Sequence, residues 1–540
     1  MSNYNDFIQI HKFVKHLNYK NNSFYNTKIK EKIIKTGILK YAIFPYIYIA
    51  NISKPLFKIL VKNNLSKFIF GLIILIYESE INENDFKLSD NPEPKFEDKE
   101  DKVYDVIVIG SGPGGSVAID KILEKYKNVL LIEKGKKYEP SSIEHHSFKQ
   151  TYLQFKNEGM NFSFGNIPMI FAEGSTLGGG SEVNSGLYFE LTEPYKSEIL
   201  NLSNINEKDW DAAEDEVKRY LSVQNDPNFD IDSSKSALHL GSLKNGLTSQ
   251  EIPRWKKYKP VAEHQSMQAT YLKNAFEKGL DLILSQKVVK IDNQNSEFIK
   301  VLASDDHNNK FTYKCRKVIV SAGTIETPKI LKNSNLIKNK VRFNFHPMHR
   351  VVAENKNEIN RGDLFPSIQS WTSDKEFKFG YSVSTFPYIK ATLASLGGKK
   401  DDLDFKSLAC YFSSTVLKYS HGRIFYFRDY DIPFIYIKKK DRVRLKKGFD
   451  MLHKILREGG STNIWPTSPT KLAPMTTVHV FGSLPIAISK DIGKYGELVC
   501  DPRIKISDGS ILPLAPWGNP QAVIMVLNLI LIKEWINNHE

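Results

Sequence analysis

The sequence predicts an α/β fold whose core is a Rossmann-like βαβ unit near residue 103, and three observations lead to this. Val106–Ile109 is a continuous apolar run, as in strands buried on both faces of a parallel sheet. The letters GSGPGG follow it in a GxGxxG spacing. Helical spacing over Ser116–Lys127 then leads to a second buried strand, Val129–Ile132.

The turn between these elements has the chemistry of a dinucleotide site. Gly110, Gly112 and Gly115 permit a tight turn and a close approach of backbone to a pyrophosphate. The following helix N-terminus offers unpaired N–H groups, and Glu133 can accept a hydrogen bond from a ribose hydroxyl. The alternative is a glycine-rich turn that binds nothing. The unit fits NAD as well as FAD, so other segments must decide the cofactor.

Two further segments are rich in glycine. EGSTLGGGSEVNSGLYFE, Glu173–Glu190, lets a second backbone segment approach a flat ligand closely. KVIVSAGTIETPKIL, Lys317–Leu331, predicts a buried strand, a turn at Gly323 and a helix capped by Thr324.

The C-terminal segment supplies a histidine and a buried helix. His479 lies three residues before a glycine in HVFGS. Asn519 followed by Pro520 predicts a helix with Asn as N-cap and Pro as first residue. Ala522–Ile532 is apolar nearly all round, so we expect this helix to be buried, with its N-terminus stabilising negative charge on a ligand.

Composition excludes several classes of protein. The chain has 540 residues, 41% hydrophobic and 25% charged, which is ordinary for globular proteins. Its 75 basic and 61 acidic residues give a net charge of +14, but the excess is mostly lysine, so we expect no nucleic-acid partner. The three cysteines lie far apart and no Cys/His cluster occurs, so neither a disulfide framework nor a metal site is expected.

The first hundred residues divide by charge. Met1–Phe70 has 12 lysines and two acids, whereas residues 78–102 have 10 acids and four lysines. We interpret 1–77 as a basic helical extension, either packed on the body or lying on an anionic membrane surface, and 78–102 as an acidic linker. No signal peptide, twin-arginine signal or membrane-spanning run is evident. We therefore expect a cytoplasmic protein, which would contact the membrane peripherally if residues 1–77 lie on its surface.

Taken in order, these motifs resemble those of the glucose–methanol–choline (GMC) family of FAD-dependent oxidoreductases. The matching pieces are GSGPGG, LGGGSEVN, SAGTIETPKIL, the His346–Pro347 pair, HVFGS and SDGSILP…GNP, over nearly all of Val103–Glu540. The resemblance implies an FAD-binding domain of discontinuous segments (103–191, 265–340 and 474–540) and a β-sheet substrate-binding domain (192–264 and 341–473). Aromatic strands within 377–436 then either line the substrate site or form a core sheet that never touches substrate.

The resemblance also implies a reaction, the oxidation of a CH–OH group to an aldehyde or ketone by hydride transfer to flavin. His479 would be the base and Asn519 would orient the substrate oxygen, whereas His346 and His349 are interpreted as structural. Glu182, where the family usually has a small residue, is expected to point to solvent, the alternative being a contact with flavin. The implied cofactor-binding residues are Gly110, Gly112, Pro113, Gly115, Glu133, Lys134, Gly178, Gly179, Ser181, Asn184, Val288, Ala322, Gly323, Asp508, Gly509, Asn519 and Pro520.

Other activities of the same fold stay open at this point. One is a dehydrogenase that passes electrons to a membrane quinone or a protein. Another is a flavin-dependent lyase or photodecarboxylase, because fold-level motifs do not fix the reaction. A third is a flavin-binding protein without turnover.

Overall fold

The computed structural model describes residues 102–539, except 140–141, 144, 160, 168, 230–235, 261, 357–366, 386–387, 390–391, 394–395, 397–405, 428–429 and 468–474. The predicted basic extension 1–77 and the acidic linker up to residue 101 lie outside the described residues. Among the described helices, none is both long enough and apolar enough to cross a membrane.

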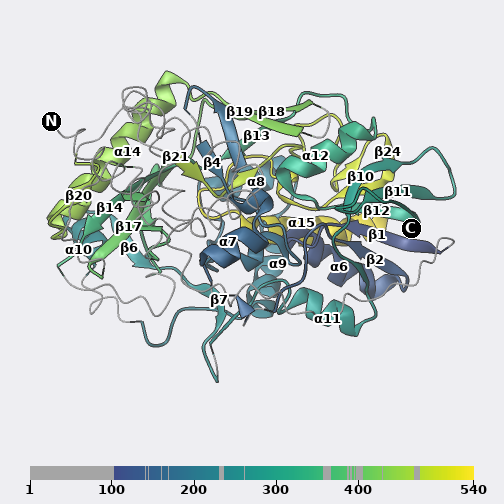
Figure 1. Ribbon diagram of the computed structural model, residues 1–540, viewed down its shortest axis with the longest axis horizontal. Coiled ribbons are helices and arrows are strands. Elements are labelled where there is room, and N and C mark those ends of the chain that lie inside the picture. Colours follow the sequence, from purple (N-terminus) through teal and green to yellow (C-terminus); the bar gives the residue numbers. More distant parts are fainter. Residues whose placement is uncertain are drawn as a thin grey trace, which may run out of the picture.

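The first of two large sheets is built on the predicted βαβ unit (Figure 1). Strands β1 and β2 pair in parallel, β1 also pairs in parallel with β12, and β12 pairs in parallel with β24. The order is β10-β11-β12-β1-β2-β9, with β24 on β12 and β23 on β24. The strands are β1 (Val103–Ile109), β2 (Val129–Ile132), β9 (Asp281–Ile283), β10 (Lys287–Asp292), β11 (Ile299–Ser304), β12 (Lys310–Val320), β23 (Glu497–Leu498) and β24 (Asp501–Ile506).

Helices α6 (Pro113–Lys125) and α15 (Gln521–Asn538) pack against each other beside this sheet (Figure 1). Helix α6 begins three residues before the predicted Ser116, because Pro113 at its first turn has a φ suited to a helix. Helix α15 is buried as predicted. It begins at Gln521 with Pro520 at the N-cap, so the prediction that Asn519 caps it is wrong.

The second large sheet has 13 strands in the described part of the chain and is mainly antiparallel. Its order is β22-β13-β18-β19-β3-β4-β21-β14-β17-β16-β15-β6, with β20 on β14. The strands are β3 (Asn161–Gly165), β4 (Met169–Phe171), β6 (Thr248–Glu251), β13 (Arg342–Phe345), β14 (Met348–Glu354), β15 (Ile368–Trp371), β16 (Phe377–Tyr381), β17 (Leu408–Thr415), β18 (Gly422–Phe427), β19 (Tyr430–Ile435), β20 (Ile464–Trp465), β21 (Met475–Thr477) and β22 (Val480–Phe481).

The aromatic segments of 377–436 are strands, as predicted, and helices α10 and α14 pack beside them (Figure 1). Phe377, Phe379 and Tyr411 form a buried cluster with Phe449 of α14. A short sheet of β5 (Val223–Gln224), β7 (Arg254–Lys257) and β8 (Glu263–His264) is separate. The remaining helices are α7 (Phe148–Gln154), α8 (Tyr195–Ser203), α9 (Glu207–Tyr220), α10 (Ala237–Lys244), α11 (Tyr271–Glu277), α12 (Gly323–Asn333), α14 (Lys439–Glu458) and the 3₁₀ turns η4 (Lys156–Gly159), η5 (Gly179–Glu182) and η6 (Gly509–Ile511).

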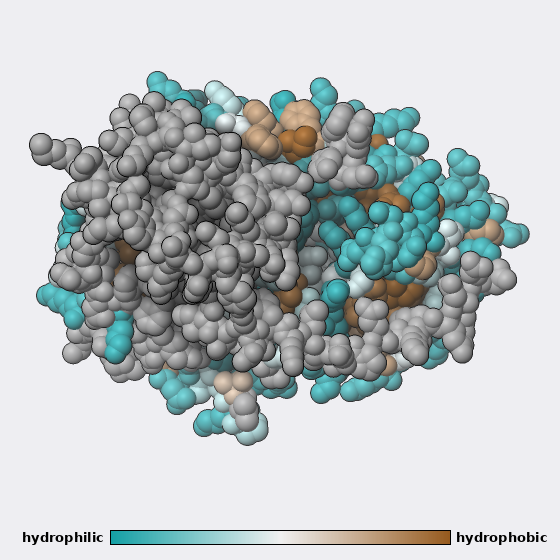
Figure 2. Space-filling view, in the orientation of Figure 1, coloured by the Kyte–Doolittle hydropathy of each residue, from teal (hydrophilic) through white to brown (hydrophobic). Residues whose placement is uncertain are grey.

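The two sheets confirm the predicted α/β and α+β fold, with a Rossmann-like unit joined to a β-sheet region. The predicted domain boundaries stay a prediction. Strands β3, β4, β21 and β22 belong to the larger sheet, although the predicted FAD-binding segments include them. On the face shown in Figure 2, hydrophobic residues gather over the β18–β19 hairpin, where Phe425 is 53% exposed.

Candidate active site

A cavity of about 570 Å³ is lined by residues of both large sheets. Its walls include the β1–α6 turn, the end of β2, the loop around η5, the start of α12, and parts of β14, β17 and β21. The predicted site residues in its wall are Gly110, Gly112, Pro113, Glu133, Lys134, Gly179, Asn184, Val288, Ala322, Gly323, His479, Asp508, Gly509, Asn519 and Pro520. We call the part around the β1–α6 turn, Glu133, Lys134 and Val288 the nucleotide end, and the part formed by β14, β15, β16 and β17 the sheet end.

The β1–α6 turn keeps its glycines for different reasons. Gly110 has φ +94°, and a Cβ there would lie 2.3 Å from the carbonyl oxygen of Ser321. A Cβ on Gly115 would lie 2.3 Å from the oxygen of Gly110, so Gly115 allows the helix to pack on the strand without lining the cavity. A Cβ on Gly112 would meet nothing within 4 Å, so its backbone faces open space, as pyrophosphate binding requires.

Glu133, at the end of β2, is fixed by three hydrogen bonds. Its Oε2 accepts from the backbone N–H (2.9 Å) and the hydroxyl (2.6 Å) of Ser111, and its Oε1 accepts from the N–H of Gly135 (2.7 Å). Carboxylate oxygens have further lone pairs, so the group retains capacity to accept another hydrogen bond. The acid is therefore oriented before any ligand arrives.

The glycine-rich loop around η5 lies directly against this turn. A Cβ on Gly179 would lie 2.9 Å from Cα of Gly112, which explains why the loop carries no side chain there. Gly178 does not line the cavity; its N–H donates to the hydroxyl of Ser111 at 2.9 Å. Asn184 lines the cavity and donates to the side-chain oxygen of Gln521 at 2.6 Å, which joins the loop to α15.

Two residues of this loop point away from the cavity. The hydroxyl of Ser181 is buried, donating to the oxygen of Gly178 (2.8 Å) and accepting from the N–H of Met267 (3.0 Å). The expectation that Glu182 points to solvent is wrong, because its carboxylate lies beneath the loop and accepts from the N–H of Gln268 at 3.2 Å. Burial raises the pKa of Glu182 to about 7.

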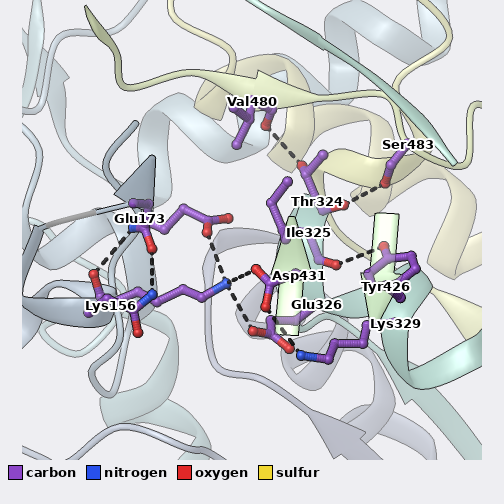
Figure 3. Close-up of polar contacts among 12 residues, drawn as sticks. Lys156, Glu173, Thr324, Ile325, Glu326, Lys329, Tyr426, Asp431, Val480 and Ser483 are labelled. Carbon is purple, nitrogen blue, oxygen red and sulfur yellow. Dashed lines mark hydrogen bonds and ion pairs between the residues drawn. The ribbon is translucent and has the colours of Figure 1, made fainter. Parts of the chain in front are cut away.

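The start of α12 is held by a residue from the far end of the chain. Asp508 Oδ2 accepts from the N–H of Gly323 (2.9 Å) and the hydroxyl of Thr327 (2.5 Å). The predicted cap, Thr324, donates instead to the carbonyl oxygen of Val480 at 2.8 Å (Figure 3). Asp508 therefore positions the cavity wall, and its oxygens are occupied by protein donors.

His479 faces the cavity with a second histidine behind it. Its Nδ1 lies 3.3 Å from Nδ1 of His346, and the backbone N–H of His346 donates to the oxygen of His479 at 3.2 Å. Burial, then the charges of His346 and Lys378, lower the pKa of His479 well below its usual 6.5. The imidazole is therefore neutral at neutral pH. His346 does not line the cavity, but it orients His479 and is more than a packing residue.

Asn519 lies in the cavity wall beside a buried lysine that the sequence did not indicate. Lys378 Nζ, on β16, donates to Asn519 Oδ1 at 3.3 Å. The ammonium lies 4.6 Å from the ring centre of Phe189 and 5.8 Å from that of Trp517. Lys378 is 4% exposed, and burial lowers its pKa to about 7. Because Lys378 engages the amide oxygen, the NH₂ group of Asn519 is left to donate elsewhere.

A buried ion cluster borders the nucleotide end (Figure 3). Lys156 Nζ lies 3.3 Å from Glu173, 2.9 Å from Glu326 and 3.2 Å from Asp431. Lys329 contacts Asp431 at 3.2 Å. Burial opposes ionisation of Glu326, but Lys156 and its lysine neighbours hold the pKa of that carboxyl well below its usual value. The cluster joins α12 to β19 and so connects the two large sheets.

Together these residues fit a cavity that holds a dinucleotide and has potentially reactive side chains at one end. Open glycine backbone, a helix N-terminus and a fixed acid share one cavity with a neutral imidazole and a carboxamide. Within the described residues, no group of three or more His, Cys, Asp or Glu is placed to hold a metal ion. Such a fold and cavity are typical of dinucleotide-dependent oxidoreductases.

Comparison with known proteins points to a family. The family model for GMC oxidoreductase matches residues 104–355. An uncharacterized GMC-type oxidoreductase, y4nJ, of Sinorhizobium fredii is 23% identical over 474 residues, 78% of this chain and 92% of that protein. The long-chain-alcohol oxidase FAO1 of Arabidopsis thaliana is 25% identical over 294 residues, which are 47% of this chain and only 38% of the plant enzyme.

Solved structures share the fold at low identity. Pyridoxine 4-oxidase from Mesorbium loti superposes with a TM-score of 0.64 at 13% identity, covering 81% of this chain and 100% of that one. Formate oxidase of Aspergillus oryzae gives a TM-score of 0.64 at 12% identity, covering 82% and 99%. Residues 104–355 thus match the GMC oxidoreductase model, and the chain is similar to a GMC-type oxidoreductase over most of its length, which supports an oxidoreductase.

Proposed function

We propose that this protein oxidises the CH–OH group of an alcohol to an aldehyde or ketone, with FAD as the electron acceptor. The observation that carries the proposal is that His479 and Asn519 line the same cavity as the glycine turn. The family match and the alcohol oxidases among the relatives support this reaction class. When bound, the flavin supplies the two-electron acceptor, and this chain supplies position, charge and a base.

The residues that would hold FAD follow from their place in the wall. The turn at Gly110–Gly115 would receive the pyrophosphate, and Glu133 a ribose hydroxyl. Val288 and Lys134 would border the adenine, and the N-terminus of α15 would face the flavin ring. That N-terminus favours negative charge on the ring because the helix dipole is positive there.

His479 would accept the hydroxyl proton of the alcohol. Its lowered pKa keeps it unprotonated, as a base must be. The role requires that Nδ1 of His479 carries hydrogen and donates to His346, because Nε2 then has its lone pair free. Asn519, with its oxygen engaged by Lys378, would donate to the substrate oxygen and hold it in line.

An anaerobic alcohol panel tests the proposal. Purified protein with its yellow cofactor should bleach with some alcohols, and His479→Ala should slow bleaching by about 10²- to 10⁴-fold while keeping FAD. His307→Ala, at an exposed histidine, is the matched control and should leave the rate unchanged. A protein that retains FAD but is bleached by no alcohol would contradict the proposal. Peroxide formed in air would indicate an oxidase, and none would indicate another acceptor.

The cellular setting is part of the same proposal. A cytoplasmic enzyme with peripheral membrane contact would use the basic block Met1–Phe70, which lies outside the described residues. Each lysine near an anionic surface contributes about 1 kcal/mol. Co-sedimentation of the full chain with anionic but not neutral vesicles supports this contact, and equal sedimentation with both contradicts it.

A further inference from the structure

The sheet end of the cavity contains an arginine with no partner. Arg350 lies on β14, two residues after Met348, so both side chains point to the same face, and both line the cavity. Its register partner on β17 is Phe412, which also lines the cavity. The guanidinium is thus placed in an apolar part of the wall.

Among the described residues, the side chain of Arg350 makes no hydrogen bond and no ion pair, and its Nε is buried without an acceptor. Other arginines that pack within the fold are paired. Arg444 Nε contacts Glu376 at 2.7 Å, and Arg503 Nη2 contacts Asp501 at 2.8 Å. Arg350 is half-buried, and a buried donor such as its Nε is costly unless a hydrogen-bond acceptor compensates it. No such acceptor lies among the described residues.

Two further donors in the same wall lack acceptors. Gln369 Nε2 is buried without a partner, and Gln369 is 1% exposed. Thr476 Oγ1 is buried without a partner on β21, beside Met348 of β14. Both residues line the cavity. Three unsatisfied polar groups in one wall favour an acceptor-rich ligand, since buried polar groups are normally hydrogen-bonded.

The cavity wall also carries the apolar side chains of Ile170, Val383, Leu396 and Phe412, beside polar ones such as Ser382, Tyr388 and Thr392. One guanidinium balances one carboxylate, whereas a phosphate monoester carries up to two negative charges and would need a second cation. Apolar walls with a single fixed cation therefore suit a hydrocarbon body with one carboxylate.

We propose that the substrate alcohol carries a carboxylate, that Arg350 binds it, and that the hydrocarbon body lies against the sheet end. This inference rests on the proposed function and names its substrate class, a hydroxy carboxylic acid. Arg350 then contacts substrate and determines specificity, while His479 and Asn519 serve the hydroxyl. The carboxylate then supplies the acceptor that Arg350 Nε lacks in the described part of the chain.

The test compares ω-hydroxy carboxylates of increasing chain length with their methyl esters, which keep the shape and lose the charge. At the best length, kcat/KM should be about 10- to 100-fold higher for the acid. Arg350→Leu should abolish that preference, and Arg350→Lys should keep part of it. Arg316→Leu, at an exposed arginine of β12, should leave it intact. FAD content and Tm are measured for every variant, so that misfolding is recognised.

A binding arm separates this inference from the proposed reaction. Straight-chain carboxylates without a hydroxyl, from butyrate to decanoate, should bind the wild-type holoenzyme by calorimetry about 10- to 100-fold more tightly than Arg350→Leu, and alkyl phosphates should bind more weakly. If acids bind through Arg350 but no alcohol bleaches the flavin, the carboxylate site stands and the proposed oxidation fails. If acids and esters react equally, if Arg350→Leu keeps the preference, or if this variant acts only by losing FAD, the inference is overturned.

Discussion

At the nucleotide end of the cavity the polar groups are paired with one another, whereas at the sheet end several donors lack an acceptor. Glu133 receives three hydrogen bonds, and Lys156 contacts three carboxylates. Arg350 and Gln369, by contrast, present donors that nothing described in the protein accepts. The difference fits our two proposals: a nucleotide end whose polar groups are already oriented for the cofactor, and a sheet end where a substrate would supply the missing acceptor.

The largest effect on the free energy of unfolding should come from removing the buried ion pairs at the nucleotide end. Lys156→Met leaves the carboxylates of Glu173, Glu326 and Asp431 buried with less compensation, so we expect the free energy of unfolding to fall by about 3–5 kcal/mol. Urea denaturation measures this. Lys446→Met, which removes an exposed pair with Asp450, should cost only about 0.3–0.5 kcal/mol. Equal losses in the two variants would show that burial of the cluster is unimportant.

A smaller effect on the free energy of unfolding is expected at acidic pH, and it comes from the second large sheet, which forms the sheet end of the cavity. His349 of β14 has a buried Nδ1 without a partner, and burial lowers its pKa to about 4. Below about pH 6.5 the unfolded chain binds a proton that the folded chain does not, so stability falls as pH falls towards 4. The loss from this group is about 2 kcal/mol at pH 5.

His349→Phe removes this titration and keeps a ring of similar size against Phe449, whose centre lies 5.0 Å away. Between pH 7 and 5 the variant should lose about 2 kcal/mol less stability than the wild type, as measured by urea denaturation at each pH. Parallel pH dependences of the two proteins would mean that His349 does not contribute.

The smallest effect should come from substituting Lys378, which connects the sheet end to the amide of Asn519. Lys378→Met frees the oxygen of Asn519, so the amide loses its fixed orientation, and we expect flavin reduction to slow about tenfold, with FAD content unchanged. The wild-type rate should also change in a step near pH 7, where this lysine titrates, and the variant should lack that step. If the variant and the wild type have the same pH profile, Lys378 contributes only to packing.

Sequence reasoning reached the nucleotide end because its signals are local. A strand, a GxGxxG turn and an acid after the second strand lie within about thirty residues, and backbone geometry requires glycine there. His479 and Asn519 came from a family resemblance, since one histidine among 13 carries no signal by itself. Their side chains do line the predicted cavity, but their catalytic roles stay a prediction.

The residues of the sheet end could not be predicted from the sequence, because strand register determines which of them become neighbours. Arg350 and Phe412 become neighbours only when β14 pairs with β17, and no spacing in the sequence indicates this. Lys378 lies in an aromatic strand and had no distinguishing pattern. The mistaken caps have the same origin: Thr324 and Asn519 form hydrogen bonds with Val480 and Lys378, residues distant in the chain, which local rules do not include.

The docking of β24 on β12, with Asp508 just beyond it, has a consequence for synthesis. A ribosome adds about 5–20 residues per second, and the first strand is finished hundreds of residues before this last strand appears. Until then β12 has an unpaired edge at Val318–Val320, and α6 lacks the apolar surface of α15. The nascent chain therefore exposes apolar surface and an unpaired strand edge around an incomplete cavity. We expect chaperones to bind it until the C-terminal segment has been synthesised.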